Sequence, residues 1–404
     1  MSPNFKMPTK DNYDVIIVGG AIYGSSVAWF LTNNEDFNGS VLVVEMDPSY
    51  EFASTSLTNS CIRQQFSQKI NIFLSQHGAN YVKNFKSFMN DDSRVPEIIF
   101  HEFGYMYLAN NKTSIETLKS LQKIQKACGA GTKHLTPAEI KNLYPFYNIK
   151  DIKGANHNII DEGYFDGNTV FYWWKKKARE NGVEYIDNEV VEINLCKNKK
   201  KVASVTLKTG QIIPCENLVN ASGPRACKTS KMVGIDIPVE PRKRYSFIFK
   251  SPKPLDRDLP LTIDPSGVHI RSDGQNYLAG CGPEFDPAVR YDDFSFEPNI
   301  WEEKVWPILA NRIPHFETVR LINSWVGHYA YNTFDQNAIL GRHPDITNFI
   351  FVNGFSGHGL QQSPGIGKCI SELIIFNQYR SLDLSALDFN RITENKPLVE
   401  VAVI

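Results

Sequence analysis

The sequence lacks any run of apolar residues long enough to span a membrane, and it lacks paired cysteines. No apolar run reaches the roughly 18 residues that a membrane span requires. The seven cysteines lie far apart and form no CxxC pair, which argues against a zinc site or a disulfide framework and predicts reduced thiols. The net charge is also small, at −1, so nothing indicates a nucleic-acid partner.

The N-terminus lacks the features of a targeting segment. Its first twelve residues are polar and contain no arginine, which argues against a secretory signal and against a typical mitochondrial transit peptide. We therefore expect a soluble, cytoplasmic protein. The apolar tail LVEVAVI is too short to span a membrane and predicts a terminal strand or a docking segment. A length of 404 residues favours two domains.

The N-terminal part of the chain has the pattern strand, glycine-rich turn, helix, strand. Tyr13 to Val18 (YDVIIV) is a short β-branched run, typical of a buried parallel strand. The turn GGAIYG follows at residues 19–24, a helical pattern continues to about Thr32, and a second buried strand runs from Ser40 to Glu45. This order, within about 33 residues, has the length of a Rossmann half-unit.

Five residues of this unit are candidates for binding a dinucleotide. Gly19 allows the tight turn, and Gly24 lets the helix pack close to the strand, so that a pyrophosphate can lie against the helix N-terminus. Gly20 and Ala21 lie between them, and Ala21 departs from the usual second glycine. Glu45 follows 21 residues after Gly24, where its carboxylate can accept bonds from ribose hydroxyls. The pattern favours FAD or NAD over NADP.

The remainder of the chain predicts helices and an antiparallel sheet. Helical spacing covers residues 69–89 and 113–128, the latter with Thr113 and Glu116 as a capping box, and a third helix starts at Thr136. Residues 190–214 alternate like an antiparallel meander. Strand-like pieces rich in Pro and Gly follow from about residue 235 to 320. We expect an α/β fold, with a Rossmann-like domain and a mixed or antiparallel-sheet α+β domain.

A glycine-rich loop near the C-terminus is the most informative segment. The strand NFIFV leads into NGFSGHGLQQSPGIGK, residues 353–368, in which Ser363 and Pro364 favour an N-cap and a first helical position. Its glycines would let the backbone approach a flat ligand. A flavin gains negative charge at its N1–C2=O edge on reduction, and N–H groups at a helix start would stabilise that charge. The alternative is a glycine-rich loop that binds nothing.

These motifs resemble those of the FAD-dependent amine oxidases in the D-amino acid oxidase superfamily, which include monomeric sarcosine oxidase and glycine oxidase. The resemblance covers GFSGHG, the N-terminal glycine turn with Glu45, LVNASGP at 218–224 and SWVGHYAYNTFDQNAILG at 324–341. The segments VEPRKRY, YNTFDQN and GFSGHGLQQ are similar to those of the mitochondrial FAD-dependent oxidoreductase domain-containing proteins. The resemblance spans nearly the whole chain and favours FAD over NAD.

The resemblance implies a discontinuous FAD-binding domain. We assign to it residues 1–85, 150–230 and 321–404, and we assign residues 86–149 and 231–320 to the substrate domain. The implied FAD contacts, including those of the N-terminal unit, are Gly19, Gly20, Ala21, Gly24, Glu45, Ser54, Ala221, Gly223, Gly354, Gly357, His358, Gly359 and Leu360.

The resemblance also implies hydride transfer from a C–H bond to flavin N5, for which the site needs a cation to hold a substrate carboxylate. Arg63 lies at or near the family's carboxylate-binding arginine, and an Arg fork suits that role. Arg244, His269 and Tyr329 are further candidates on the substrate side. Each could instead be structural: a phosphate or surface contact for Arg63, a salt bridge for Arg244, and packing for His269 and Tyr329.

Two departures from the family concern the flavin. The position of the cysteine that binds flavin covalently in some oxidases is His328 here, which favours non-covalent FAD. Gln361 replaces a lysine that helps O₂ react, which favours a dehydrogenase that passes electrons to a protein or a quinone rather than to O₂. The histidines lack metal-ligand spacing, so we expect no metal.

Two functions remain open at this point. The first is oxidation of a small amine or amino acid, sarcosine-like or of the D series. The second, implied by the resemblance to the mitochondrial proteins, is a flavoprotein scaffold that assists assembly of respiratory complex I. Retention of Arg63 and of the full glycine loop favours the enzyme.

Overall fold

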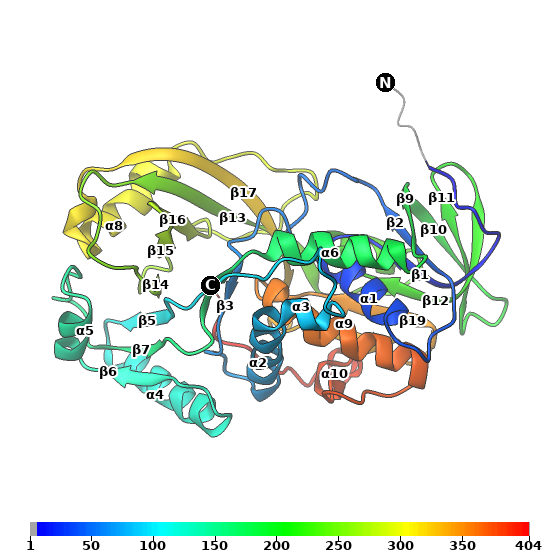
Figure 1. Ribbon diagram of the computed structural model, residues 1–404, viewed down its shortest axis with the longest axis horizontal. Coiled ribbons are helices and arrows are strands. Elements are labelled where there is room, and N and C mark those ends of the chain that lie inside the picture. The colour runs from blue at the N-terminus through cyan, green and yellow to red at the C-terminus, as the bar shows by residue number, and fades with distance from the viewer. Residues whose placement is uncertain (1–5, 404) are drawn as a thin grey trace.

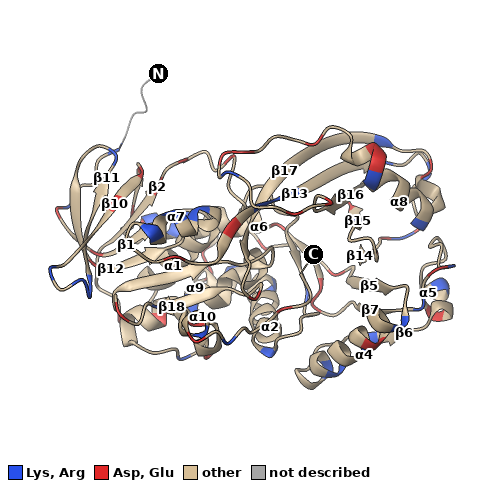
Figure 2. Ribbon diagram, turned by 180° about the vertical axis from the view of Figure 1, so that it is seen from behind, with Lys and Arg blue, Asp and Glu red and all other residues tan. Residues whose placement is uncertain are grey.

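The computed structural model describes residues 6–403 and contains two eight-stranded sheets and a small three-stranded one. The first sheet occupies one half of the molecule and the second the other half (Figure 1). Basic and acidic residues are interspersed over both halves (Figure 2). None of the helices in this part of the chain combines the length and the apolarity needed to cross a bilayer.

The first sheet has a parallel centre built from separated stretches of chain. Strand β1 pairs in parallel with β2 on one side and with β12 on the other, and β12 pairs in parallel with β19. An antiparallel meander, β10-β11-β12, continues the sheet as the sequence predicts. The strands are β1 (Tyr13–Val18), β2 (Val41–Glu45), β9 (Glu184–Asp187), β10 (Val190–Leu195), β11 (Val202–Leu207), β12 (Ile212–Asn220), β18 (Ile339–Arg342) and β19 (Phe349–Asn353).

Helices cover this sheet because its strands are apolar on both faces. One face packs on α1 (Ile22–Thr32), α6 (Gly167–Glu180) and α9 (Gly359–Phe376), and the short α7 (Ala226–Lys231) covers the other. Helices α2 (Lys69–Lys83) and α3 (Phe85–Phe88) extend the helical layer beside α9 (Figure 1). The predicted Rossmann-like arrangement is confirmed.

The second sheet is largely antiparallel, in the order β17-β13-β16-β15-β14-β5-β7-β6, with one parallel pair between β14 and β5. Its strands are β5 (Tyr105–Ala109), β6 (Lys133–Leu135), β7 (Gly154–Asn158), β13 (Val239–Lys250), β14 (Leu261–Ile263), β15 (His269–Asp273), β16 (Asn276–Cys281) and β17 (Arg320–Asn332). Helices α4 (Lys112–Ala127), α5 (Pro137–Leu143) and α8 (Trp306–Arg312) pack around it. The small sheet joins β3 (Cys61–Ile62), β8 (Gly163–Phe165) and β4 (Phe100–His101).

The division of the chain into domains remains a prediction. Strand pairing places β7 and β17 in the second sheet, although β7 and all of β17 except Arg320 lie within stretches that we assigned to the FAD-binding domain.

Two predicted helix starts were wrong. Helix α4 begins at Lys112, because Asn111 rather than Thr113 caps it by accepting a bond from the Ser114 amide. Helix α9 begins at Gly359, so that Ser363 and Pro364 lie within it. Proline cannot donate to the Leu360 carbonyl four residues earlier, and the Ser363 hydroxyl donates to that carbonyl instead, at 2.7 Å. The start at Thr136 is confirmed, with Glu139 completing the capping box.

Candidate active site

A cavity of about 830 Å³ lies where the carboxyl ends of the first sheet's strands face the second sheet. Its lining includes the β1–α1 turn, the end of β2 and the loop after β12 on the first sheet's side. Strands β13, β15 and β17 and the loop before α9 line the other end. Ligands of open α/β sheets bind at this edge, and the volume suits a ligand pocket.

The glycines of the β1–α1 turn are required by close backbone contacts. Gly19 has φ +96°, and a Cβ atom there would lie 2.6 Å from the Ala221 carbonyl oxygen. A Cβ atom on Gly24 would lie 1.9 Å from the Gly19 carbonyl oxygen. Ala21 is the N-cap of α1, and neither a side-chain cap nor an acidic residue occupies the first turn. The helix start thus offers positive potential to a phosphate at the cavity wall.

Glu45 stands at the end of β2 and lines the cavity. Its carboxylate accepts bonds from the amides of Gly20, at 2.7 Å, and of Asp47, at 2.8 Å. Burial raises the pKa of this carboxyl above its ordinary value. The two amides fix its orientation, and its remaining lone pairs can accept hydroxyl groups from a ligand in the cavity.

The loop before α9 approaches the second sheet closely. Gly357 has φ +93°, and a Cβ atom there would lie 2.3 Å from the Tyr329 ring. The preceding Ser356 also has a positive φ, of 47°. Helix α9 then starts without a side-chain cap at His358. The amides of Gly359, Leu360 and Gln361 are therefore the free donors of the first helical turn, at the cavity wall.

His358 is buried, at 2% exposed, and neither of its ring nitrogens has a hydrogen-bond partner among the described residues. Burial and the nearby Arg63 guanidinium lower its pKa to about 3, so the ring is neutral. Buried polar nitrogens without partners are costly. A ligand with polar edges, such as a flavin, fits this wall because it can supply both partners and acceptors for the helix amides.

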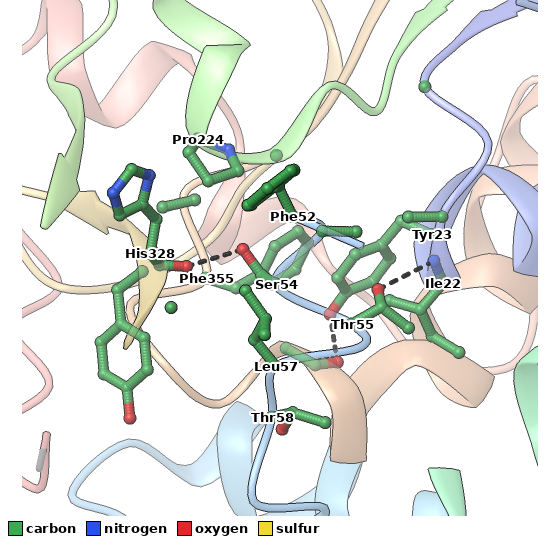
Figure 3. Close-up of a pocket in the computed structure, with 18 of the residues that line it drawn as sticks. Ile22, Tyr23, Phe52, Ser54, Thr55, Leu57, Thr58, Pro224, His328 and Phe355 are labelled. Carbon is green, nitrogen blue, oxygen red and sulfur yellow. Dashed lines mark hydrogen bonds between the residues drawn. The ribbon is translucent and has the colours of Figure 1, made fainter. Parts of the chain in front are cut away.

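Tyr23 and Phe355 join the β1–α1 turn to the loop before α9, and sequence reasoning missed both. Their rings stack at 3.8 Å with an interplanar angle of 11°. The Tyr23 hydroxyl donates to the Gly359 carbonyl at 2.6 Å, and the Thr55 hydroxyl accepts a bond from the Ile22 amide (Figure 3). An aromatic residue inside the glycine turn, YG at 23–24, was the available signal.

The remaining predicted FAD contacts fall into two groups. Ser54, Ala221 and Gly223 line the cavity, although the Ser54 hydroxyl already donates to the His328 carbonyl at 2.6 Å (Figure 3). Gly20, Gly24 and Gly354 do not line the cavity and lie behind its wall. The individual contacts remain predictions.

All five predicted catalytic residues line the cavity, namely Arg63, Arg244, His269, Tyr329 and Gln361. Arg244 is already paired: its guanidinium donates two bonds of 2.9 Å to the Asp286 carboxylate and lies 4.6 Å over the Tyr329 ring. The neutralised charge makes Arg244 a weaker candidate for a substrate carboxylate, and it favours the structural alternative for this residue.

Arg63 has a different environment. Its guanidinium donates to the backbone carbonyls of Gln65, at 2.6 Å, and of Ala402, and it lies 4.0 Å over the Phe66 ring. Within residues 6–403 no carboxylate lies within ion-pair distance of it. The Gln361 side chain accepts a bond from the Arg63 amide at 2.8 Å, so Gln361 supports this arginine.

His269 is neutral and is held by Asn59, which also lines the cavity. Burial, Arg244 and Arg271 lower its pKa to about 4. Its Nε2 atom lies 3.1 Å from the side-chain nitrogen of Asn59, a contact that sequence reasoning missed. A Cβ atom on Gly280 of the neighbouring strand would collide with the same ring, at 2.4 Å.

His328 and Cys61 are the two cavity residues that concern covalent attachment of the flavin, because His328 stands at the position of the attaching cysteine and Cys61 is a cysteine of the cavity wall. The His328 ring stacks on Phe294 at 4.1 Å, and its Nε2 atom lies 2.8 Å from the Asp293 carbonyl. Cys61 lines the cavity, which sequence reasoning did not anticipate, and burial raises the pKa of its thiol.

In the described part of the chain no group of three His, Cys, Asp or Glu residues is arranged to hold a metal ion.

The FAD dependent oxidoreductase (DAO) family matches residues 14–373. The chain belongs to this family. FAD is accordingly its cofactor, and the glycine turn, Glu45 and the α9 start provide a site that fits it. The family predicted from the sequence is confirmed.

The chain is also similar to individual proteins. The chain is 34% identical to FAD-dependent oxidoreductase domain-containing protein 1 of Xenopus laevis, over 99% of this chain and 86% of that protein. It is 23% identical to human mitochondrial sarcosine dehydrogenase, over 71% of this chain and 32% of that protein. The crystal structure of L-proline dehydrogenase from P. horikoshii superposes with a TM-score of 0.83 and 25% identity, covering 96% of this chain and 99% of that one.

Proposed function

We propose that the protein is a dehydrogenase that oxidises the C–N bond of a small amine or amino acid, with FAD held non-covalently. The observation that carries this proposal is a buried arginine without an acidic partner in the described chain, Arg63, in the same cavity as the α9 start. When bound, FAD would accept a hydride from the substrate carbon at its N5 atom.

The chain's own residues would bind and orient the substrate. Arg63 retains N–H donors beyond the two that it gives to carbonyls, and these would bind the substrate carboxylate. Tyr329 and neutral His269 would form the walls of the substrate end and exclude water. Because His269 stays neutral, it would not repel the positive charge that develops on the substrate nitrogen.

The proposal also concerns whether the substrate nitrogen is a primary or a secondary amine. The names of two similar proteins specify secondary amines, sarcosine and L-proline. We therefore place N-alkyl and cyclic amino acids first among the candidate substrates, ahead of primary D-amino acids. As electron acceptor we propose a protein or a quinone rather than O₂, because Gln361 stands where the oxidases have lysine. The cytoplasmic location also remains a proposal.

The test is anaerobic mixing of the purified holoprotein with sarcosine, L-proline, N-methyl amino acids and D-amino acids. Bleaching of the yellow flavin colour would support the enzyme. Slow recovery of colour in air would support a dehydrogenase, and rapid recovery would indicate an oxidase. Unchanged colour across the panel would contradict the proposal and leave the complex I scaffold alternative.

The matched variant is Arg63→Met, which keeps an unbranched apolar stem and removes the guanidinium charge. We expect the KM for a carboxylate substrate to rise by about tenfold or more, because a charge-assisted hydrogen bond contributes about 1.5–3 kcal/mol. The KM for an amine without a carboxylate should not rise.

A further inference from the structure

Residues 398–402 are called here the C-terminal strap. This segment lies between the loop after β17, which it contacts at Asp335, and the side chain of Arg63. It follows α10 (Asn390–Thr393) and passes α2 on its way to the middle of the molecule, where it appears in red in Figure 1. Its first anchor is Asp335, which accepts bonds from the amides of Leu398, at 3.1 Å, and of Glu400, at 3.0 Å. Asn337 donates to the Leu398 carbonyl.

Asp335 is itself fixed. It is fully buried, and the Arg391 guanidinium donates two bonds to its carboxylate, at 2.7 and 3.0 Å. Two side chains of the motif YNTFDQN, Asp335 and Asn337, therefore hold the strap, a role that the dinucleotide site does not explain.

Glu400 provides the second anchor, at the N-terminus of α2. Its buried carboxylate accepts bonds from the amides of Ser67, at 2.8 Å, and of Gln68, at 3.1 Å. It also accepts bonds from the Ser67 hydroxyl at 2.7 Å and from the Asn71 side chain at 2.9 Å. Helix α2 has no side-chain cap and no acidic residue in its first turn. Glu400 therefore supplies, from the other end of the chain, the negative charge that this helix start favours.

The strap ends on Arg63. The Ala402 carbonyl accepts one bond from the Arg63 guanidinium, opposite the bond to Gln65. The Ala402 amide donates back to the Glu400 carboxylate at 3.0 Å, so the position of this carbonyl depends directly on Glu400. Together with the Phe66 ring, the two carbonyls hold the guanidinium in one orientation.

The same network reaches the flavin-binding helix. Asn71 donates to the Asn337 side chain at 2.7 Å and accepts a bond from the Gln362 side chain of α9 at 3.1 Å. The neighbouring Gln361 holds the Arg63 amide. The strap and α9 therefore bond Arg63 directly, and α2 anchors the strap through Glu400 and α9 through Asn71.

We propose that Glu400 is a positioning residue, which acts through the strap to hold the Arg63 guanidinium in the orientation that binds a carboxylate ligand. The inference rests on the proposed function in that Arg63 is taken as the carboxylate-binding group. Without Glu400, the Ala402 carbonyl loses its support, and the guanidinium gains rotational freedom that carboxylate binding must then remove.

The binding test uses the holoprotein and the flavin spectrum as reporter. Acetate and benzoate are titrated as carboxylate probes, and acetamide and benzamide as uncharged probes of the same shape. In Glu400→Ala we expect the Kd of the carboxylates to rise about tenfold, with the amides unchanged. Glu400→Gln, which keeps a neutral acceptor, should lie in between and also serves if the alanine variant fails to fold. An unchanged Kd, or an equal loss for the amides, would overturn the proposal.

The matched control is Lys83→Met at the other end of α2. Lys83 binds Glu102 at 2.7 Å and also Asp161, so its loss destabilises the same helix without touching the strap. We expect a lower Tm and an unchanged Kd for acetate. If the Kd for acetate also rises in Lys83→Met, the effect of Glu400 follows from the lower stability of α2 alone, and the proposal is contradicted.

A second readout does not depend on any substrate. Phenylglyoxal modifies accessible guanidinium groups, and peptide mass spectrometry measures the rate at Arg63 relative to the exposed Arg94. We expect Glu400→Ala to raise the relative rate at Arg63 several-fold. If no amine reduces the flavin but this rate rises, the proposed function fails and the strap proposal holds; an unchanged rate would overturn the strap proposal itself.

Discussion

Gly357 shows at the scale of one residue how the loop before α9 depends on Tyr329 of β17. Its φ of +93° disfavours any side chain, and a methyl group would meet the Tyr329 ring at 2.3 Å. We expect Gly357→Ala to move the loop away from Tyr329 and to lose FAD during gel filtration, measured as the ratio of flavin to protein absorbance.

A control for backbone strain is available elsewhere in the chain. Gly129 has a similar φ of +82°, but a Cβ atom there would meet nothing within 4 Å. Gly129→Ala should cost stability and leave the flavin ratio unchanged. Equal flavin ratios in the two variants would show that the contact with Tyr329 does not matter.

Glu162 is a second residue with a measurable consequence. It is fully buried, accepts bonds from the Gln64 amide at 2.7 Å and the Gln65 side chain at 2.9 Å, and burial raises its pKa to about 7. In the unfolded chain this carboxyl ionises near pH 4.5, so between pH 4.5 and 7 the folded state holds the extra proton. The free energy of unfolding should therefore fall as pH rises through that window, by about 3 kcal/mol from this group.

Glu162→Gln isolates that contribution, because its amide imitates the protonated acid. Urea titrations at pH 5 and pH 7 give the unfolding free energy of both proteins. We expect the rise in pH to destabilise the natural protein more than the variant. A difference that is the same at both pH values would contradict a raised pKa.

At the scale of the element, the start of α9 departs from its sequence signals for a local reason. The Ser-Pro pair at 363–364 normally marks a helix start, but here the Ser363 hydroxyl takes over the bond to the Leu360 carbonyl that Pro364 cannot make. We expect Ser363→Ala to leave this carbonyl without its donor and to lower the free energy of unfolding by about 1 kcal/mol.

Ser371 is the control within the same helix. Its hydroxyl donates to the Lys368 carbonyl at 2.7 Å, and no proline interrupts the backbone bonds there. Ser371→Ala should therefore cost less than Ser363→Ala in the same denaturation experiment. A larger cost at Ser371 would argue against the compensation at Pro364.

The elements that the sequence predicted are those with strong local signals. The strand at Tyr13–Val18, the capping box at Thr136 and the meander from 190 to 214 follow from local patterns alone, and the structure confirms all three. The cap at Asn111 was missed because a second plausible capping pair, Thr113 and Glu116, lies next to it.

The site was predictable only where a motif carries its own geometry. The glycine turn and the GFSGHG loop do so, because the positive φ angles at Gly19 and Gly357 and the helix starts that follow them are local. The supports of Arg63 come from residues far away in the chain, Gln361 and Ala402, and no periodicity indicates such contacts. A salt bridge was among the alternatives for Arg244, but its partner Asp286 lies 42 residues away and no local pattern identifies it.

At the scale of the whole molecule, one cavity joins the two sheets, and FAD bound there would connect them. A ligand that binds only the folded state at 100 times its Kd stabilises that state by about 2.7 kcal/mol. We therefore expect the Tm to rise when the protein freed of FAD is resupplied with it. Tyr23 tests the connection, because its hydroxyl bonds the Gly359 carbonyl and links α1 to α9 across 336 residues of sequence.

Tyr23→Phe keeps the ring stack on Phe355 and removes only that hydrogen bond. Losing it should lower the Tm of the FAD-free protein, because the Gly359 carbonyl loses its donor, and the loss corresponds to about 1 kcal/mol. Saturation with FAD should narrow the difference, since on our proposal the bound dinucleotide would itself hold both helix starts. Differential scanning fluorimetry with and without FAD measures both effects, and a gap that widens with FAD would show that the two stretches do not share one ligand.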